Sequence, residues 1–258
     1  MKLKNLHLFN NKIKDEEMSL VNSKSKRQDF SSRTENKFSE NELTKDLAYL
    51  AGILRDGSLP KPYNNQYEIQ ISQDNIEWLE NVKVMLKRLF PEKDLKIVKY
   101  GNQTPRIKIY SKEIYHYLVK LFEYPGTQTK WKIPSFVING SSDIKKRFIE
   151  GFFEAEGEVP LSKQNNKYKI WIRFHHSWDG DKCIVLEQMK MMLENNFGVK
   201  CGNITGPKKE KKFPSFDLAI YGNNVYEFFK EMKIFHPKHN KRLRIMMRKD
   251  TATQSLAD

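Results

Sequence analysis

The stretches YLAGILRDG at residues 49–57 and IEGFFEAEG at residues 149–157 lie one hundred positions apart and follow one pattern. Each places apolar and small residues at helical spacing and ends in one carboxylate followed by glycine, with Asp56 in the first and Glu156 in the second. A carboxylate at the end of a closely packed helix is well placed to bind a metal ion. Because the pattern occurs twice, we expect the two helix ends to meet and to hold a pair of metal ions on a pseudo-twofold axis.

The composition favours a polyanionic partner. The chain has 258 residues, enough for one large domain or two fused smaller ones with a buried core. Its formal net charge is +14 and its pI is about 9.5, which favours nucleic acid first and an anionic membrane surface second. The two cysteines, Cys183 and Cys201, match no zinc-site spacing, and we expect both to be reduced structural thiols.

The sequence predicts neither a membrane span nor a targeting signal. It contains no run of about eighteen apolar residues, the length that a bilayer requires. The first residues lack an apolar signal core, and the acidic residues 15–17 argue against a transit peptide. We therefore expect no membrane partner, and we expect the protein to act where it is made, in an archaeal or bacterial cytoplasm or in an organelle that encodes it.

Each motif begins a copy of the same order of elements. In the first copy, alternation predicts strands at residues 67–72 and 106–110, with another strand near 96–100. Helical spacing predicts helices at residues 76–90 and 113–122.

In the second copy, a capping signal at Ser142 and Asp143 precedes the motif helix. Matching strands are predicted at residues 169–174 and 216–220, and matching helices at 184–197 and 225–232. This repetition divides the chain into a flexible or partly helical arm (1–42), a first repeat (43–123), a linker (124–142), a second repeat (143–249) and a tail (250–258).

These residues resemble the LAGLIDADG homing endonucleases, in the monomeric form with two motifs per chain. The resemblance covers residues 43 to about 245 and rests on two motifs with one acid each, the order αββαββα, and Ile133-Pro134 before the second motif helix. It implies an α+β fold of two pseudo-symmetric αββαββα repeats. The motif helices would pack at the centre, and two antiparallel sheets would form a saddle along DNA.

The small residues of the motifs fit this expectation, since helices can cross closely only where side chains are small; these positions are Ala51, Gly52, Gly151 and Ala155. The first motif also departs from the family pattern. It has Ala51 where glycine is usual, Leu54 where an acid is usual, and Arg55 where a small residue is usual. We expect the charge of Arg55 to contact a phosphate or to alter metal affinity.

The paired acids predict a metal-dependent hydrolase. Two metal ions about 4 Å apart can serve the attacking and the leaving oxygen of a phosphodiester. Oxygen ligands with bound water suit Mg²⁺, and Mn²⁺ or Ca²⁺ can occupy the same sites. We therefore expect Asp56 and Glu156 to be both catalytic residues and metal ligands. Glu154 lies on a different helix face, and we expect it to be solvated or ion-paired and outside catalysis.

The resemblance also implies supporting catalytic residues. A polar residue after the second strand of each repeat would order water, and Gln73 occupies this place, with His176 as its nearest counterpart in the second copy. A lysine where the fourth strand meets the next helix would offset charge on the scissile phosphate. Lys112 matches this position, whereas the second copy has Asn223.

Alternation along the strands predicts which side chains face DNA. Apolar residues 69, 71, 107, 109, 170, 172 and 174 should face the helices. The opposite face carries the mixture of side chains that base-edge readout in a major groove requires: Glu68, Gln70, Ser72, Arg106, Lys108, Tyr110, Lys169, Trp171, Arg173, His175, Ser215 and Asp217. Further DNA contacts are expected from the turns and from a basic loop: Ser58, Lys61, Lys163, Lys167, Lys208, Lys209, Lys211 and Lys212.

The sequence thus predicts a monomeric, site-specific endonuclease of double-stranded DNA, intron-encoded or free-standing. A long recognition site cut with short 3′ overhangs is implied by the resemblance. Two alternatives stay open on the same fold. One is a maturase that binds the RNA of its host intron, and the other is a DNA-binding regulator. Both motif acids are retained, which favours the nuclease.

Overall fold

The computed structural model describes residues 39–55, 59–60, 62–161, 163–164, 167–208 and 214–254, and all of them belong to one compact unit. The first half consists of α2 (Glu40–Ile53), β1 (Glu68–Ser72), α3 (Ile76–Leu89), β2 (Ile97–Val98), β3 (Arg106–Tyr110) and α4 (Lys112–Leu121). A linker with a 3₁₀ turn (Gln128–Lys130) and the short helix α5 (Ser135–Ile138) follows.

The second half consists of α6 (Ser142–Glu156), β4 (Gly157–Glu158), β5 (Lys163–Gln164), β6 (Lys167–Tyr168), β7 (Trp171–Ser177), α7 (Ile184–Phe197), β8 (Ile204–Lys208), β9 (Ser215–Tyr221), α8 (Asn223–Glu231) and α9 (Pro237–Gln254). Among the described residues, no helix combines the length and the apolarity needed to cross a membrane.

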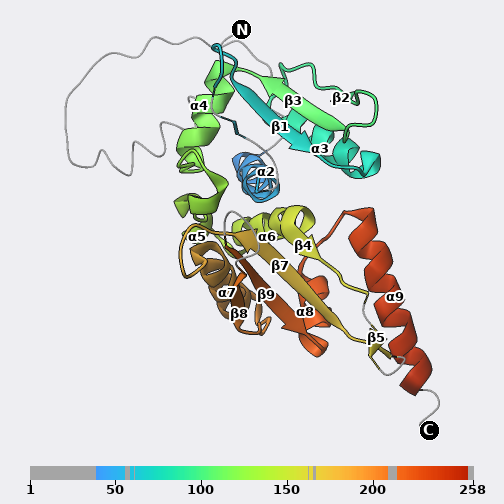
Figure 1. The fold of residues 1–258 in the computed structure, drawn as a ribbon. Helices are drawn as coiled ribbons and strands as arrows, with labels where there is room; N and C mark the ends of the chain where they lie inside the picture. The colour runs from blue at the N-terminus through green and yellow to red at the C-terminus, as the bar shows by residue number, and fades with distance from the viewer. Residues whose placement is uncertain are drawn as a thin grey trace. The chain divides into compact units, whose positions relative to one another are not determined.

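Two antiparallel sheets flank the motif helices α2 and α6 (Figure 1). The first sheet has the strand order β1-β3-β2, and the second has the order β4-β7-β9-β8. The strands β5 and β6 form a separate two-stranded pair. The α+β fold with two antiparallel sheets and centrally packed motif helices is therefore confirmed.

Most predicted elements form close to their expected bounds, and the differences have local causes. The motif helix α6 is capped by Ser141, whose hydroxyl accepts from the backbone N–H of Ile144, so the expected cap at Ser142 is wrong by one residue. The strand predicted at residues 169–174 is β7, which runs on to Ser177 because seven residues pair with β9. Nothing in the alternation indicated β8 or the last helix, α9.

The crossing of α2 and α6 depends on two glycines. A Cβ added to Gly52 would lie 2.5 Å from the carbonyl oxygen of Phe148, and one added to Gly151 would lie 2.4 Å from that of Tyr49. Real Cβ atoms do not approach backbone oxygens this closely. The two backbones therefore touch, and the apolar residues around the crossing, such as Leu50 and Phe152, are buried.

Replacing Gly151 with alanine should force the motif helices apart. We expect Gly151→Ala to lower the free energy of unfolding by about 3 kcal/mol, at the upper end of the range for overpacking a close-packed core. Urea unfolding would measure this loss. The control is Gly101→Ala, where the added methyl group meets nothing within 4 Å and only the φ of 53° is strained. That variant should lose about 1 kcal/mol, and an equal loss in both would contradict the crossing.

The helix α9 packs back onto α6 through a buried histidine. The ring of His239 lies 5.2 Å from the ring of Phe153, and its Nδ1 is buried without a hydrogen-bond partner among the described residues. Burial, with the charges of His236 and Lys238, lowers the pKa of His239 to about 3. The folded protein therefore holds this side chain neutral.

This contact should make stability fall in mild acid. An unfolded histidine takes up a proton at a pKa of about 6.5, whereas folded His239 does so only near 3. Its contribution is therefore complete above about pH 6.5 and is lost as the pH falls from there toward 3. We expect His239→Phe to flatten the decline of unfolding free energy between pH 7 and pH 5 by up to about 1.4 kcal/mol per pH unit. An unchanged pH slope in urea unfolding would contradict this.

Candidate functional site

The end of α6 places Glu156 at the junction of the two halves. Glu156 is the last residue of α6, is half-buried, and has its Oε1 3.9 Å from Nδ1 of His176. Asp56 and Gly57 lie outside the described residues, which reach Arg55 and resume at Leu59. Within the described part of the chain, no group of three or more histidine, cysteine, aspartate and glutamate side chains could hold a metal. A metal site at the motif ends thus stays a prediction.

Arg55 points into the protein and not toward solvent. Its side chain is 2% exposed, and its guanidinium donates to the carbonyls of Trp131 and Lys132, the latter at 2.8 Å. The expected contact with a phosphate is therefore wrong, because the guanidinium is buried and points to these two carbonyls. Burial lowers the pKa of Arg55 to about 9, and the charge of Glu156 acts in the opposite direction. The side chain stays charged near neutral pH, and its field reaches Glu156.

His176 is enclosed beside Glu156. Its side chain is 2% exposed, its ring lies 5.7 Å from that of Phe152, and neither ring nitrogen has a hydrogen-bond partner among the described residues. Burial, followed by the charge of Arg55, lowers the pKa of His176 to about 3. His176 is therefore a neutral side chain in the wall of the site, without access to solvent.

The two supporting residues of the first half have local contacts. The side-chain oxygen of Gln73 accepts from the backbone N–H of Asp74 at 2.9 Å, so this amide stabilises the turn after β1. Lys112 is exposed at the start of α4, with its Nζ 5.7 Å from the ring centre of Tyr67. It lines an open hollow together with Tyr67, Tyr110 and the turn before β1. Their roles in catalysis remain predictions.

The first sheet separates apolar and polar faces as expected. All four isoleucines at positions 69, 71, 107 and 109 are buried. The opposite face carries partly or fully exposed polar side chains, and some pair with each other: Lys108 lies 3.1 Å from Glu68, and Gln70 donates to Ser72 at 3.0 Å. The polar face therefore consists of Glu68, Gln70, Ser72, Arg106, Lys108 and Tyr110.

The second sheet differs from the expectation at β9. On β7, Ile172 and Phe174 are buried, Ile170 before it is partly buried, and Lys169, Trp171, Arg173 and His175 lie on the accessible face. On β9, however, Ser215 is 4% exposed and Asp217 is 6% exposed. Asp217 pairs in register with His175 and so lies on the expected face, but it is covered there and not open to solvent. The predicted DNA contacts of Ser215 and Asp217 stay predictions.

Asp217 is held by three cationic or polar neighbours. It contacts Nδ1 of His175 at 2.7 Å, Nη1 of Arg173 at 3.5 Å, and Nζ of Lys208. Burial alone would raise the pKa of Asp217, but the bonds from His175 and Lys208 and the charge of Arg173 prevail and lower it to about 2. Arg173 also pairs with Glu158 at 2.5 Å. This network fixes the directions of the basic side chains on the second sheet.

The remaining predicted DNA contacts lie outside the described side chains. They are Ser58, Lys61, Lys163, Lys167, Lys209, Lys211 and Lys212. Sequence reasoning also missed Tyr221, which is exposed and stacks on Trp171 with ring centres 6.3 Å apart. Nζ of Lys169 lies 5.8 Å and 5.5 Å from the two ring centres. The two rings and Lys169 come together because β7 and β9 pair in the register that sets Trp171 opposite Tyr221, and this register cannot be read from either strand alone.

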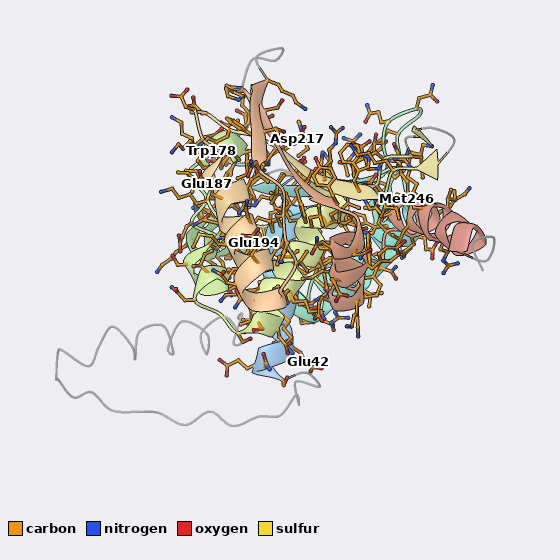
Figure 2. The ribbon with its side chains drawn as sticks, turned by 90° about the horizontal axis from the view of Figure 1, so that it is seen from below. Glu42, Trp178, Glu187, Glu194, Asp217 and Met246 are labelled. Atoms are coloured by element: carbon orange, nitrogen blue, oxygen red, sulfur yellow. The ribbon has the colours of Figure 1, made fainter. Side chains whose placement is uncertain are left out.

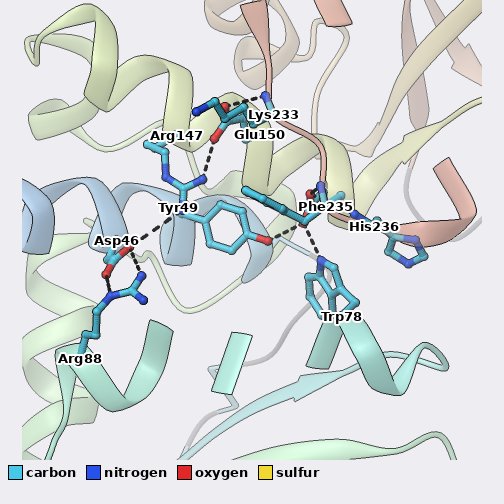
Figure 3. A network of polar contacts seen from close by, with 10 residues as sticks. Asp46, Tyr49, Trp78, Arg88, Arg147, Glu150, Lys233, Phe235 and His236 are labelled. Carbon is cyan, nitrogen blue, oxygen red and sulfur yellow. Dashed lines mark hydrogen bonds and ion pairs between the residues drawn. The ribbon is translucent and has the colours of Figure 1, made fainter. Parts of the chain in front are cut away.

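Glu154 is the centre of a buried network and not a solvated side chain. It is 1% exposed, and its carboxylate accepts from Trp78 Nε1 at 2.5 Å, from the N–H of His236 at 3.2 Å, from the hydroxyl of Tyr49 and from the N–H of Phe235 (Figure 3). The expectation that Glu154 is solvated or ion-paired was wrong, because α3 and the segment before α9 both cover this helix face. Its exclusion from catalysis stays a prediction. The carboxylate thereby joins the two halves of the fold.

A second set of charges continues this network along the helices. Glu150 accepts from Arg147 at 2.6 Å and from the N–H of Lys233 at 2.8 Å. Arg147 lies 3.9 Å from Asp46, which also binds Arg88 at 2.7 Å (Figure 3). Asp46 lies on α2 and Glu150 on α6, so these ion pairs connect the motif helices at a distance from their ends.

The two acids at the end of α6 should therefore respond differently to neutralisation. Glu154→Gln places an amide N–H₂ among donor groups, and we expect it to lower the free energy of unfolding by about 2 kcal/mol. Glu156→Gln, at a half-buried helix end, should cost less than about 1 kcal/mol. Thermal unfolding of both variants would measure this, and an equal or reversed order would contradict these roles.

Comparison with known proteins agrees with this arrangement. A family model described as a LAGLIDADG-like domain matches residues 143–233. The homing endonuclease I-ApeI of Aeropyrum pernix is 35% identical over 122 residues, which make up 46% of this chain and 54% of that protein. The chain thus spans about half the length of the curated relative that it matches.

Solved structures show a similar fold. I-DmoI in complex with DNA and Ca has a TM-score of 0.54 and 20% identity, over 74% of this chain and 90% of that chain. I-WcaI bound to its DNA recognition sequence has a TM-score of 0.55 and 14% identity, over 80% of this chain and 88% of that chain. Residues 143–233 thus match the LAGLIDADG-like domain model, and the chain is similar in fold to the homing endonucleases I-DmoI and I-WcaI.

Proposed function

We propose that this protein is a site-specific endonuclease of double-stranded DNA that cuts phosphodiesters with divalent metal ions. The observation that carries the proposal is the backbone contact of the two motif helices at Gly52 and Gly151, since each glycine is followed within five residues by a motif acid, Asp56 or Glu156. The relative I-ApeI, named as a homing endonuclease, supports it.

Glu156, the motif acid that the structure describes, has the donor chemistry of a metal ligand. Glu156 offers carboxylate oxygens at the end of α6, and oxygen is the ligand that Mg²⁺ prefers. We propose Asp56 as the second ligand. Bound metal would activate a water molecule and stabilise the departing oxygen. I-DmoI has been solved with DNA in the presence of Mg or Mn and with Ca, which supports a divalent ion without selecting one.

The chain's own residues would then bind and orient the substrate. The polar faces of the two sheets would lie against DNA, with Lys112 near the scissile phosphate in the first half. Figure 2 labels Glu42, which lies in the first turn of α2, and Asp217, which lies on β9 of the second sheet. The two residues lie at opposite ends of this view. We propose that the acids at the ends of the motif helices lie where bound DNA would pass.

Neutralising the acids should separate cleavage from binding. We expect Asp56→Asn and Glu156→Gln each to abolish Mg²⁺-dependent cleavage while DNA binding survives, because each removes a metal ligand and no DNA contact. The assay incubates genomic DNA of the encoding organism, and a plasmid library of randomised sites, with the protein and Mg²⁺ or EDTA. Sequencing of the new ends identifies the site.

The matched control is Glu187→Gln, which makes the same charge change on an exposed position of α7 (Figure 2). It should cut like the original chain. Cleavage that persists in both Asp56→Asn and Glu156→Gln would overturn the assignment of the acids. Metal-dependent breaks at one long site, with short 3′ overhangs, would support a homing endonuclease, whereas tight binding to an intron transcript without breaks would support a maturase.

A further inference from the structure

The end of the first motif helix is bound by the linker between the repeats. The side-chain amide of Gln128 donates to the carbonyl oxygen of Leu54 at 2.9 Å. Carbonyl groups in the last turn of a helix have no partner within the helix, and here the linker supplies one. The contact falls two residues before Asp56.

Arg55 makes the second set of contacts with the same linker. Its guanidinium donates to two successive carbonyls, those of Trp131 and Lys132, and lies 4.0 Å from the ring centre of Trp131. Burying a charge is costly unless it is fully hydrogen-bonded, and the buried Nε of Arg55 has no hydrogen-bond partner among the described residues. An apolar side chain would fill this space at less cost, but it would not fix the direction of the helix end as two planar donors do.

The linker is itself bound to both halves of the protein. Trp131 Nε1 donates to the carbonyl of Phe122, at the end of α4, at 2.6 Å. On the other side, Ile133 N–H donates to the side chain of Gln188 on α7 at 3.1 Å, and Asp179 N–H donates to the carbonyl of Thr129 at 2.9 Å. The segment that holds Arg55 thus has a defined position relative to the second repeat.

The end of the second motif helix is held by strand pairing and not by the linker. After Glu156 the chain enters β4 directly, and Gly157 pairs with Phe174 of β7. Strand pairing therefore fixes the backbone next to Glu156. For the first motif, the contacts nearest to Asp56 within the described residues are those of Leu54 and Arg55 with the linker.

We propose that Arg55 and Gln128 are positioning residues, which hold the end of α2 against the linker and so place Asp56 relative to Glu156. This inference rests on the proposed function, because it takes Asp56 and Glu156 as metal ligands. It assigns the linker a role in building the site, beyond joining the two repeats.

The test uses the full chain and two variants. Arg55→Lys keeps the charge but loses the paired donors and the planar stacking on Trp131. Gln128→Ala removes only the bond to Leu54 and serves as the deciding variant if Arg55→Lys does not fold. The matched control is Arg88→Lys, which makes the same substitution at a partly buried arginine that binds Asp46 through two donors, at 2.7 and 2.9 Å.

Binding of Mn²⁺ to the free protein, followed by electron paramagnetic resonance, is the first readout, and Asp56→Asn defines the signal that belongs to the site. We expect Arg55→Lys to weaken Mn²⁺ binding by about tenfold or more, as for other partners that orient metal ligands. Gln128→Ala should weaken it in the same direction by a smaller factor. Arg88→Lys should lower the melting temperature and leave Mn²⁺ affinity unchanged.

Single-turnover cleavage at saturating DNA is the second readout. The rate constant should fall in Arg55→Lys and Gln128→Ala while DNA affinity stays unchanged, because both side chains bind carbonyl groups of the protein itself. Folded variants with the Mn²⁺ affinity and cleavage rate of the original chain would overturn the positioning role. So would an equal loss of Mn²⁺ affinity in Arg88→Lys, since it would show general destabilisation. The two proposals can also fail separately. If the protein binds Mn²⁺ through Asp56 but cuts no DNA, the proposed endonuclease activity is overturned. The positioning role is still supported in that case if Arg55→Lys weakens Mn²⁺ binding.

Discussion

The contact of two helix backbones at Gly52 and Gly151 is the constraint on which the rest of the structure depends. Any side chain at either position would collide with a carbonyl oxygen or an amide nitrogen of the other helix. Only this close approach brings the last turns of α2 and α6 to one junction. Two antiparallel sheets flank the crossed motif helices, and each sheet buries apolar side chains such as Ile69 and Ile172.

A close crossing by itself leaves the helices free to slide and rotate, and buried charges remove that freedom. Glu154 and Glu150 on α6 accept hydrogen bonds from the segment before α9, and Glu154 also binds Trp78 on α3. Hydrogen bonds to a buried carboxylate have defined directions, whereas apolar contacts do not. The network therefore sets the geometry of the joint between the repeats, at the cost of burying charge, which also raises the pKa of Glu154.

The two halves share the order helix, strand, helix, two strands, helix, to which the second half adds β4, the β5–β6 pair and α9. They also differ in how the side chains of their polar faces are held. On the second sheet, Arg173, His175 and Lys208 converge on Asp217, so these side chains have fixed directions before any partner binds. On the first sheet the contacts are smaller pairs, such as Lys108 with Glu68. The motif ends differ as well, since strand pairing holds the second and the linker holds the first. The pseudo-symmetry of the sequence therefore does not produce equal half-sites.

The sequence by itself determined the two acid-bearing helices, the alternating strands and the inward isoleucines, because helical spacing and alternation are local patterns that one segment contains in full. It also determined the basic charge and the family resemblance. Only the tertiary structure decided that Glu154 and Asp217 are enclosed, that Arg55 turns inward to the linker, and that Trp171 stacks on Tyr221. Each of these depends on a partner far along the chain, 42 positions away in the bond of Asp217 with His175 and 105 positions away in that of Glu154 with Tyr49. The burial of a polar side chain depends on such distant partners, so it cannot be predicted from the spacing of residues within one segment.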